Sequence, residues 1–477
     1  MTTEGVRNTG MHDWDAGTDL LAQSIVGYAV ERLKTPKDPL WGAHPAEELA
    51  QVLASTICPE GIGGHEALRL FRDVLLPSCR SMDDPLNLAY VPTAPTPAAT
   101  MFDLVVSASS IFAGVWDAGA GAIAAENRAI RWLADLAGYP ANAGGVFVSG
   151  GSAANLSALV TARHVWRARR GDLETKTARA VLAVTSEVHA SVRSAANVMD
   201  IDVITVDVDE RGRMTGAALK SAVERDGREV FAVVVSAGTT NAGMVDDVRE
   251  IAEWCRPKNI WVHVDGAYGI AGLCSKTARH HFDGIELTDS FGVDPHKWLF
   301  APYDCAALVY RNPSFAAAAH AQHGDYLDEI DRRQWNPSDY AYHLSRRARG
   351  LPLWFSLATY GTEAYARAVE TTVEVSYAFA GELTRRPSFI LLVEPMLSVV
   401  LFSVVGWTKL DYSAWSATRA KEGFVLIVPT TWKGELCLRV CIINPKTTFT
   451  QLASILDDVE RWPSTSASSS PLPLPLS

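Results

Sequence analysis

Residues 230–269 read VFAVVVSAGTTNAGMVDDVREIAEWCRPKNIWVHVDGAYG. Residues 230–236 form an apolar run, the spacing over 248–255 predicts a helix, and 260–264 is a second apolar run. Continuous apolar strands separated by a helix are typical of a parallel sheet that is covered on both faces. This stretch therefore predicts an α/β fold.

The same alternation extends in both directions along the chain. We expect a mostly parallel central sheet with helices on both faces. Its further strands are predicted at 144–148, 181–185, 203–206, 290–293 and 306–310, and its helices at 101–112, 123–138, 152–170 and 215–225.

The pattern changes on both sides of this central part, which we place at residues 96–345. Residues 1–95 are expected to be a helical segment that packs on a partner subunit, with helices at 19–33, 46–53 and 65–75 and disorder over 1–12. Residues 346–462 are expected to form a small α+β domain, and the Ser/Pro-rich residues 463–477 a disordered tail. The small domain is predicted to contain one long helix at 354–383 and strands at 389–393, 397–405, 424–428 and 436–443.

The composition indicates an acidic, soluble and cytoplasmic protein. The chain has 477 residues, 48% of them hydrophobic, and a formal net charge of −11, which argues against a nucleic-acid partner. Its seven cysteines show neither zinc-site spacing nor a disulfide framework, so no metal is expected. No signal peptide is visible. The apolar residues 389–407 are interrupted by Glu394 and Pro395, which favours two strands over a membrane span.

Five polar residues directly follow predicted strands: Ser152, His189, Thr239, Thr240 and Asp265. The carboxyl ends of parallel strands form the edge of the sheet where ligands bind in open α/β folds. Each residue also has an ordinary structural explanation, since Asp265 could be a turn residue and the others could cap helices. Their common placement favours a shared site.

The glycines of GGVFVSGGSAANL, residues 144–156, connect a strand to a helix. Glycines let a backbone approach an anion, and a helix N-terminus supplies free N–H groups, so this turn predicts a phosphate cradle to which Ser152 adds a hydroxyl. The alternative is a simple turn with Ser152 as N-cap. Neither the Rossmann nor the P-loop glycine spacing is present.

Lys297 lies in DPHKWL, residues 294–299, between two strand-like runs. A lysine in such a setting suits Schiff-base chemistry, because burial favours the reactive neutral amine. A loop lysine that reaches solvent is the alternative.

The motifs together resemble the group II pyridoxal-phosphate-dependent amino acid decarboxylases, over residues 45–456. The shared motifs are VSGGSAANL (148–156), EVHAS (187–191), GTTNAGMVDD (238–247), HVDGAYG (263–269), DPHKW (294–298), SRRARGLPLW (345–354) and LRVCIINPKTT (438–448). The resemblance implies the fold-type I architecture, pyridoxal 5′-phosphate as the cofactor and a homodimer.

The resemblance also implies roles for individual residues. Lys297 corresponds to the Schiff-base lysine, Asp265 to the carboxylate that pairs with the pyridine nitrogen, and His189 to the residue stacked on the ring. The cofactor-binding set implied by the family is Gly151, Ser152, His189, Thr239, Thr240, Asp265, Asp294, His296 and Lys297. Arg439 matches an arginine near the substrate carboxylate, a task that suits a guanidinium.

Tyrosine and loop positions are less closely matched. The family ties a loop tyrosine to protonation of the carbanion, and the region 332–344 offers Tyr340 and Tyr342, of which we choose Tyr340; ordinary packing is the alternative. Relatives carry two aromatics in the substrate loop, where this chain has only Tyr90, followed by Val91 and Pro92. Tyr90 and Pro92 are the predicted substrate contacts, and Phe112 and Trp116 are possible further wall residues. Ala153 stands where many members have glutamate.

The expected activity is decarboxylation of an L-amino acid, with aromatic substrates favoured. Four alternatives stay open: oxidative decarboxylation-deamination to an aldehyde, decarboxylation of an acidic or diamino acid, transamination or desulfurisation on the same fold, and a catalytically silent scaffold. The decarboxylase motifs disfavour the third, and Lys297, Asp265 and His189 disfavour the last.

Overall fold

The computed structural model describes residues 10–35, 42, 44–174, 176–322 and 333–463. Its largest element is a seven-stranded sheet in the order β1-β7-β6-β5-β4-β2-β3, in which only β7 runs antiparallel to its neighbours. The strands are β1 (Gly144–Val148), β2 (Val181–Thr185), β3 (Asp202–Val206), β4 (Val230–Ser236), β5 (Trp261–Asp265), β6 (Ser290–Val293) and β7 (Ala306–Tyr310). The predicted mostly parallel sheet is confirmed.

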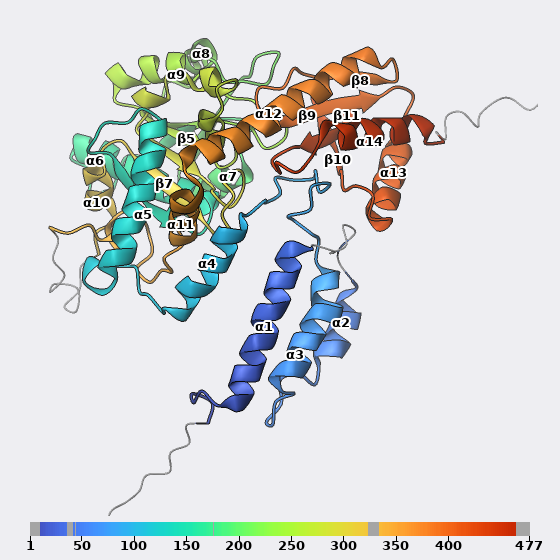
Figure 1. Ribbon diagram of the computed structural model, residues 1–477. Coiled ribbons are helices and arrows are strands. Elements are labelled where there is room, and N and C mark those ends of the chain that lie inside the picture. Colours follow the sequence, from blue (N-terminus) through green and yellow to red (C-terminus); the bar gives the residue numbers. More distant parts are fainter. Residues whose placement is uncertain (1–9, 36–41, 43, 175, 323–332, 464–477) are drawn as a thin grey trace, which may run out of the picture.

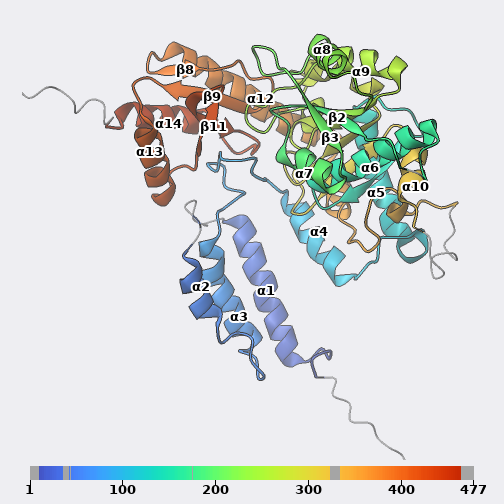
Figure 2. The same cartoon turned by 180° about the vertical axis from the view of Figure 1, so that it is seen from behind.

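Helices cover both faces of this sheet (Figures 1 and 2). Successive strand residues point to opposite faces, so Val233 and Val235 of β4 enter one core while Ala232 and Val234 enter the other. On the first face lie α5 (Trp116–Leu136), α8 (Gly216–Asp226) and α9 (Val248–Cys255), and on the second lie α6 (Gly151–Arg170), α7 (Ala190–Val198) and α10 (Ser314–His320). Burial on both faces explains why the strands are apolar runs without alternation.

A second sheet of four antiparallel strands lies in the C-terminal part, in the order β10-β11-β9-β8. Its elements are β8 (Phe389–Leu391), β9 (Val399–Val404), α13 (Lys409–Lys421), β10 (Pro429–Trp432), β11 (Glu435–Cys441) and α14 (Phe449–Arg461). The strand predicted at 424–428 was wrong, because this segment lies outside the sheet and the strand begins at Pro429. Helices α13 and α14 were not predicted, although each begins with a capping box, Thr408 with Asp411 and Thr448 with Gln451.

The long helix predicted at 354–383 was also wrong. The chain forms α11 (Leu351–Tyr360) and α12 (Thr362–Arg385), and Gly361 separates them with φ of +77°, a conformation that only glycine adopts readily. Helix α11 packs on α4 (Pro97–Ala108) and α5, whereas α12 extends from the core of the large sheet to that of the small one. Helix α4 begins and ends four residues before the predicted 101–112, because Thr96 caps it and Pro97 starts it.

Helices α1 (Ala16–Lys34), α2 (Ala46–Leu53) and α3 (Gly64–Leu70) form a group that we call the N-terminal arm. The arm projects from the rest of the chain (Figures 1 and 2), and none of its three helices contains a buried residue. Residues 71–75 continue α3 as a π-helical turn. All three helices were predicted.

Some expectations fall outside the described residues, namely disorder over most of 1–12 and over 464–477. The apolar stretch 389–407 contains β8 and β9, as predicted. Within the described ranges, no helix combines the length and apolarity that crossing a membrane requires.

Candidate active site

A cavity of about 540 Å³ lies at the carboxyl edge of the large sheet. Ten of the predicted site residues line it: Tyr90, Gly151, Ser152, His189, Thr239, Thr240, Asp265, Asp294, His296 and Lys297. Except for Tyr90, which comes from the loop before α4, they lie at or just after the ends of β1, β2, β4, β5 and β6, so the parallel topology brings together residues far apart in the sequence.

Lys297 is paired with Asp294 in the cavity. Its Nζ lies 2.9 Å from Oδ2 of Asp294. Burial disfavours the ammonium, but the charge and hydrogen bond of Asp294 outweigh it and raise the pKa of Lys297. Oδ1 of Asp294 is buried without a hydrogen-bond partner among the described residues. The site thus holds a carboxylate whose bonding capacity the protein leaves incomplete.

His296 lines the cavity next to Lys297. Its Nδ1 accepts the backbone N–H of Cys305 at 3.1 Å, so the proton of the neutral ring is on Nε2, which lies 3.6 Å from Asp294 Oδ2. Burial lowers the pKa of His296. The neutral ring therefore presents an N–H group towards the carboxylate that binds Lys297.

The glycine turn provides an open helix N-terminus. Gly150 is the N-cap of the 20-residue helix α6, and no side chain caps it. The first N–H groups of a helix have no intrahelical acceptor and face positive potential, which suits a phosphate. A Cβ on Gly151 would lie 3.1 Å from Ala267 and 3.3 Å from Asp294, so a side chain there would fill the space next to the turn. The N-cap alternative for Ser152 is not what the structure shows.

Asp265 is oriented by two hydrogen bonds. Nδ2 of Asn155 donates to its Oδ2 at 2.9 Å, and the backbone N–H of Ala267 donates to Oδ1 at 3.2 Å. Asp265 is 8% exposed and Asn155 1%, so the pair is shielded from water. A fixed, shielded carboxylate is suited to pairing with a cationic ring nitrogen.

A line of hydrogen bonds continues from Asp265 through the sheet. Asn155 must turn its NH₂ towards the carboxylate, so its Oδ1 accepts from Nε2 of His263 at 2.9 Å. Nδ1 of His263 is then the acceptor, and Oγ of Ser290 donates to it at 2.9 Å. Nε1 of Trp261 donates to Ser290 Oγ at 2.9 Å. Each polar atom in this line has a partner, and burial lowers the pKa of His263 to about 4, which keeps the ring neutral.

His189 occupies both of the positions that the sequence left open, the cavity wall and the cap of a helix. It lines the cavity, and it is also the N-cap of α7, where its Nδ1 lies 2.7 Å from Ser191 Oγ and 3.3 Å from the Ser191 backbone N. Asn155 donates to the same Ser191 Oγ at 3.0 Å. His189 and Asp265 are thereby connected through Ser191 and Asn155.

Three predicted site residues do not line the cavity: Pro92, Arg439 and Tyr340. The neighbour of Pro92, Val91, does. The guanidinium of Arg439 donates to the carbonyl oxygens of Tyr90, Thr240 and Asn241. It therefore holds two loops of the cavity wall together.

Tyr340 packs in the core beneath α6 and is stacked on Trp335, with ring centroids 4.1 Å apart. This geometry matches the packing alternative for Tyr340. Phe112 and Trp116 are likewise absent from the cavity wall.

Sequence reasoning missed Asn155, Ser191 and Tyr303 in the wall, and His263 behind it. Two of them carried a signal. Asn155 lies one helical turn after Ser152, and His263 precedes Asp265 by two residues, so both point to the same side of their elements. Tyr303 lies in a loop, where no periodicity indicates the direction of a side chain.

Comparison with known proteins identifies the family. Residues 65–405 match the pyridoxal-dependent decarboxylase conserved domain. The chain is 30% identical to the aromatic-L-amino-acid decarboxylase of Bacillus atrophaeus, over 86% of this chain and 87% of that one. It is also 30% identical to the L-2,4-diaminobutyrate decarboxylase of Rhizobium meliloti, over 79% and 77% of the two chains.

The fold agrees with this assignment. The Catharanthus roseus tryptophan decarboxylase in complex with L-tryptophan superposes with a TM-score of 0.85 at 20% identity, over 94% of this chain and 98% of that one. The open helix N-terminus, the incompletely bonded Asp294 and the shielded Asp265 fit a phosphorylated pyridine cofactor. The chain therefore belongs to the pyridoxal-dependent decarboxylase family and is a pyridoxal-phosphate-dependent amino acid decarboxylase.

Proposed function

We propose that the substrate is an aromatic L-amino acid, which the protein converts to the amine and CO₂. The observation that carries this proposal is the make-up of the cavity wall. Tyr90, Val91 and Tyr303 offer apolar and aromatic surface. Of the two carboxylates, Asp294 is paired with Lys297 through Oδ2 and its other oxygen, Oδ1, is buried, while Asp265 is paired with Asn155. The name of the Bacillus atrophaeus relative agrees with this preference.

Charged side chains find no counterpart in this wall. An acidic substrate needs a free guanidinium or ammonium, but Arg439 is bound by three backbone carbonyls and lies outside the cavity wall. A diamino acid needs a spare carboxylate. A charge buried without a partner costs several kcal/mol, so both substrate classes are disfavoured.

The residue roles follow from the positions in the cavity. We propose Lys297 as the Schiff-base lysine, Asp265 as the partner of the ring nitrogen and His189 as the side chain over the ring face. Gly151, Ser152 and the threonine loop, Thr239 and Thr240, would hold the cofactor, with Asp294 and His296 controlling the proton of Lys297. When bound, pyridoxal phosphate accepts the electrons that the departing CO₂ leaves behind.

The test is a panel of L-amino acids offered to the cofactor-loaded protein. The panel contains tryptophan, tyrosine, phenylalanine, glutamate and 2,4-diaminobutyrate, and kcat/KM is measured by CO₂ release. We expect the aromatic members to exceed glutamate and diaminobutyrate by at least about 10²-fold, the order of discrimination set by an unpaired buried charge.

The products decide between the two chemistries on this site. Amine in equal amount to CO₂ supports simple decarboxylation, whereas aldehyde, ammonia and hydrogen peroxide would establish the oxidative reaction instead. A higher kcat/KM for glutamate or diaminobutyrate would overturn the proposed substrate class.

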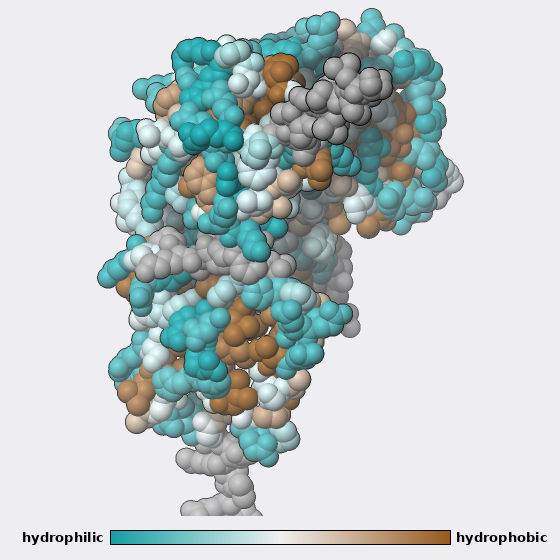
Figure 3. All heavy atoms as spheres, turned by 90° about the vertical axis from the view of Figure 1, so that its right-hand side faces the viewer, coloured by the Kyte–Doolittle hydropathy of each residue, from teal (hydrophilic) through white to brown (hydrophobic). Residues whose placement is uncertain are grey.

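We also propose that the chain forms a homodimer in which the N-terminal arm packs on the partner. Apolar side chains gather on the arm, in the lower part of the molecule in Figure 3. Leu20 is 58% exposed and Ile25 44%. Contiguous exposed apolar surface marks an interface. The seven cysteines, none of them in a disulfide, support a reducing compartment such as the cytoplasm.

A further inference from the structure

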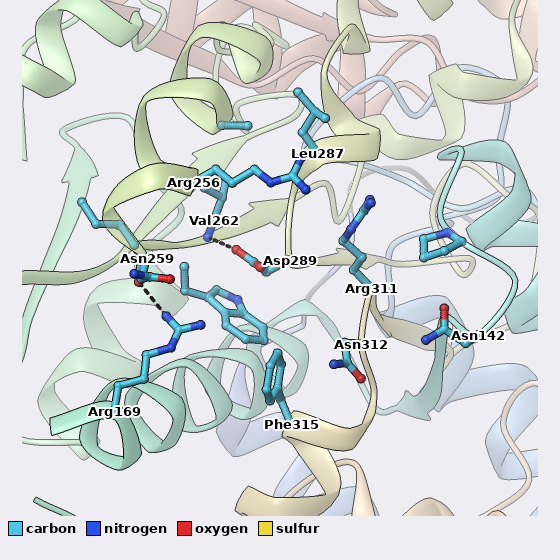
Figure 4. A pocket seen from close by; sticks show the side chains of 14 residues that line it. Asn142, Arg169, Arg256, Asn259, Val262, Leu287, Asp289, Arg311, Asn312 and Phe315 are labelled. Carbon is cyan, nitrogen blue, oxygen red and sulfur yellow. Dashed lines mark hydrogen bonds between the residues drawn. The ribbon is translucent and has the colours of Figure 1, made fainter. Parts of the chain in front are cut away.

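A second cavity, of about 350 Å³, lies at the opposite edge of the large sheet (Figure 4). Trp261 begins β5, Asp289 directly precedes β6, and Arg311 directly follows the antiparallel strand β7. These positions define the amino edge of the parallel strands. The cavity shares no lining residue with the one around Lys297.

Three arginines from separate elements line this cavity. Arg169 comes from the last turn of α6, Arg256 follows α9, and Arg311 follows β7. Arg169 donates to the carbonyl of Asn259 and Arg311 to that of Glu286, while the guanidinium of Arg256 has no hydrogen-bond partner in the part of the chain that the structure describes. Across those same residues, no carboxylate lies within 4 Å of any of the three guanidinium groups.

Among the residues that the structure describes, Asp289 is the single carboxylate of the cavity wall. Its Oδ2 accepts the backbone N–H of Val262 at 2.8 Å. Burial raises its pKa to about 6, against the opposing effect of the three arginines. The arginines are therefore not occupied by Asp289, and the cavity keeps an excess of positive charge in a protein whose formal net charge is −11.

We propose that this cavity binds a small phosphate monoester with an aromatic substituent. A dianion matches the charge excess of three guanidinium groups over one carboxylate, and guanidinium forks suit phosphate oxygens. Trp261 and the half-buried Phe315 supply an aromatic wall, with ring centroids 6.1 Å apart. The volume is in the range of small-molecule sites.

The arginines could instead only support helix C-termini, where positive charge is favourable. That explanation covers Arg169 and Arg256, which lie at the ends of α6 and α9. Arg311 likewise donates to a carbonyl of the short helix 285–287, but capping does not account for the convergence of all three arginines on one hollow.

The test is calorimetric titration of phenyl phosphate into the cofactor-loaded protein, whose glycine turn is then already occupied. Arg256→Gln removes a guanidinium that makes no protein hydrogen bond among the described residues, and we expect affinity to fall about tenfold or more, the loss of one charge-assisted pair. Asp289→Asn removes a negative charge that would repel the phosphate, and its amide oxygen can still accept the backbone N–H of Val262. We expect this variant to bind phenyl phosphate several-fold more tightly. Arg225→Gln, at an exposed arginine of α8, is the matched control and should leave affinity unchanged.

Two further probes separate the contributions. Inorganic phosphate should bind more weakly than phenyl phosphate and remain sensitive to Arg256→Gln, and phenol should not bind. The proposal is overturned if the wild-type protein does not bind phenyl phosphate, if phenol binds as tightly, or if Arg256→Gln and Asp289→Asn both leave affinity unchanged. Arg256→Gln is expected to weaken the binding of phenyl phosphate and Asp289→Asn to strengthen it. A general loss of structure would weaken binding in both variants and would therefore not give this result.

Discussion

The N-terminal arm has apolar residues at helical spacing and the large sheet has continuous apolar runs, but only the sheet buries them. Every residue of β1, β2, β4 and β5 is buried, whereas α1, α2 and α3 contain none. The apolar residues of the sheet are therefore covered within the chain, whereas those of the arm stay exposed. Periodicity indicates that a face will be covered, and it does not indicate by what.

The largest expected effect is a loss of activity at the sheet that leaves the dimer contact of the arm unchanged. Lys297→Ala removes the amine of the proposed covalent link, and we expect kcat to fall at least about 10³-fold while the dimer persists. Decarboxylation rate and sedimentation velocity measure the two consequences. Retention of more than a tenth of the wild-type rate would show that Lys297 is not the Schiff-base lysine.

The converse substitution changes the arm and leaves the sheet intact. Ile25→Asp places a charge on the exposed apolar face of α1, and we expect the dimer dissociation constant to rise about 100-fold, the effect of losing an interface anchor. Sedimentation velocity over a range of concentrations measures it. Gln23→Lys adds a charge at an exposed polar position of the same helix, next to Asp19, and should leave the dimer unaffected. Equal dissociation in both variants would remove the arm from the interface.

Buried polar groups within the sheet give a smaller effect that depends on pH. The pKa of His263 is lowered to about 4, so the folded protein binds this proton less well than the unfolded chain does. The corresponding stability is present above pH 6.5 and is lost as the pH falls towards 4. His263 should account for about 2 kcal/mol of the unfolding free energy lost between pH 7 and pH 5.

His263→Gln removes this titration and keeps a polar side chain. Urea unfolding of the cofactor-free protein at both pH values measures the loss, and we expect the variant to lose about 2 kcal/mol less than the wild type. An equal loss in the two proteins would mean that the pKa of His263 is the same in the folded and the unfolded protein.

The smallest expected effect concerns Tyr340, whose ring is stacked on Trp335 outside the cavity. Tyr340→Phe keeps this packing, so we expect the rate and the ratio of amine to aldehyde to stay within about twofold of the wild-type values. Product analysis by chromatography is the measurement. A shift to aldehyde would restore Tyr340 as the proton donor that the family resemblance suggested.

The predictable parts of the fold are those in which local sequence and environment agree. The strand at 230–236 and the helix at 248–255 were predicted to the residue, because the first is apolar throughout and the second is strongly amphipathic. The rule that ligands bind at the carboxyl edge placed His189, Asp265 and Thr239 in one cavity without knowledge of any contact.

Failures arose where a backbone conformation or a distant partner decides the outcome. Gly361 ends one helix and starts another through its positive φ, which composition alone does not announce. Arg439 binds carbonyls whose positions depend on the folded loops, so the sequence could give its charge and not its direction. The position of Tyr303 in the cavity wall was not predicted either, because this residue lies in a loop where no periodicity indicates the direction of its side chain.

The hydrogen-bonded line from Trp261 through Ser290, His263 and Asn155 to Asp265 has a consequence for how such a protein can evolve. Each member fixes whether the next one donates or accepts, so replacing one alone leaves a neighbour with the wrong polarity. Trp261, Ser290, His263 and Asn155 are accordingly expected to vary as a set among homologues while Asp265 stays constant, with paired substitutions tolerated where single ones are not. Trp261 lines one cavity and Asp265 lines the other, so the line connects the two edges of the sheet. We therefore expect changes at one edge to be accompanied by changes at the other.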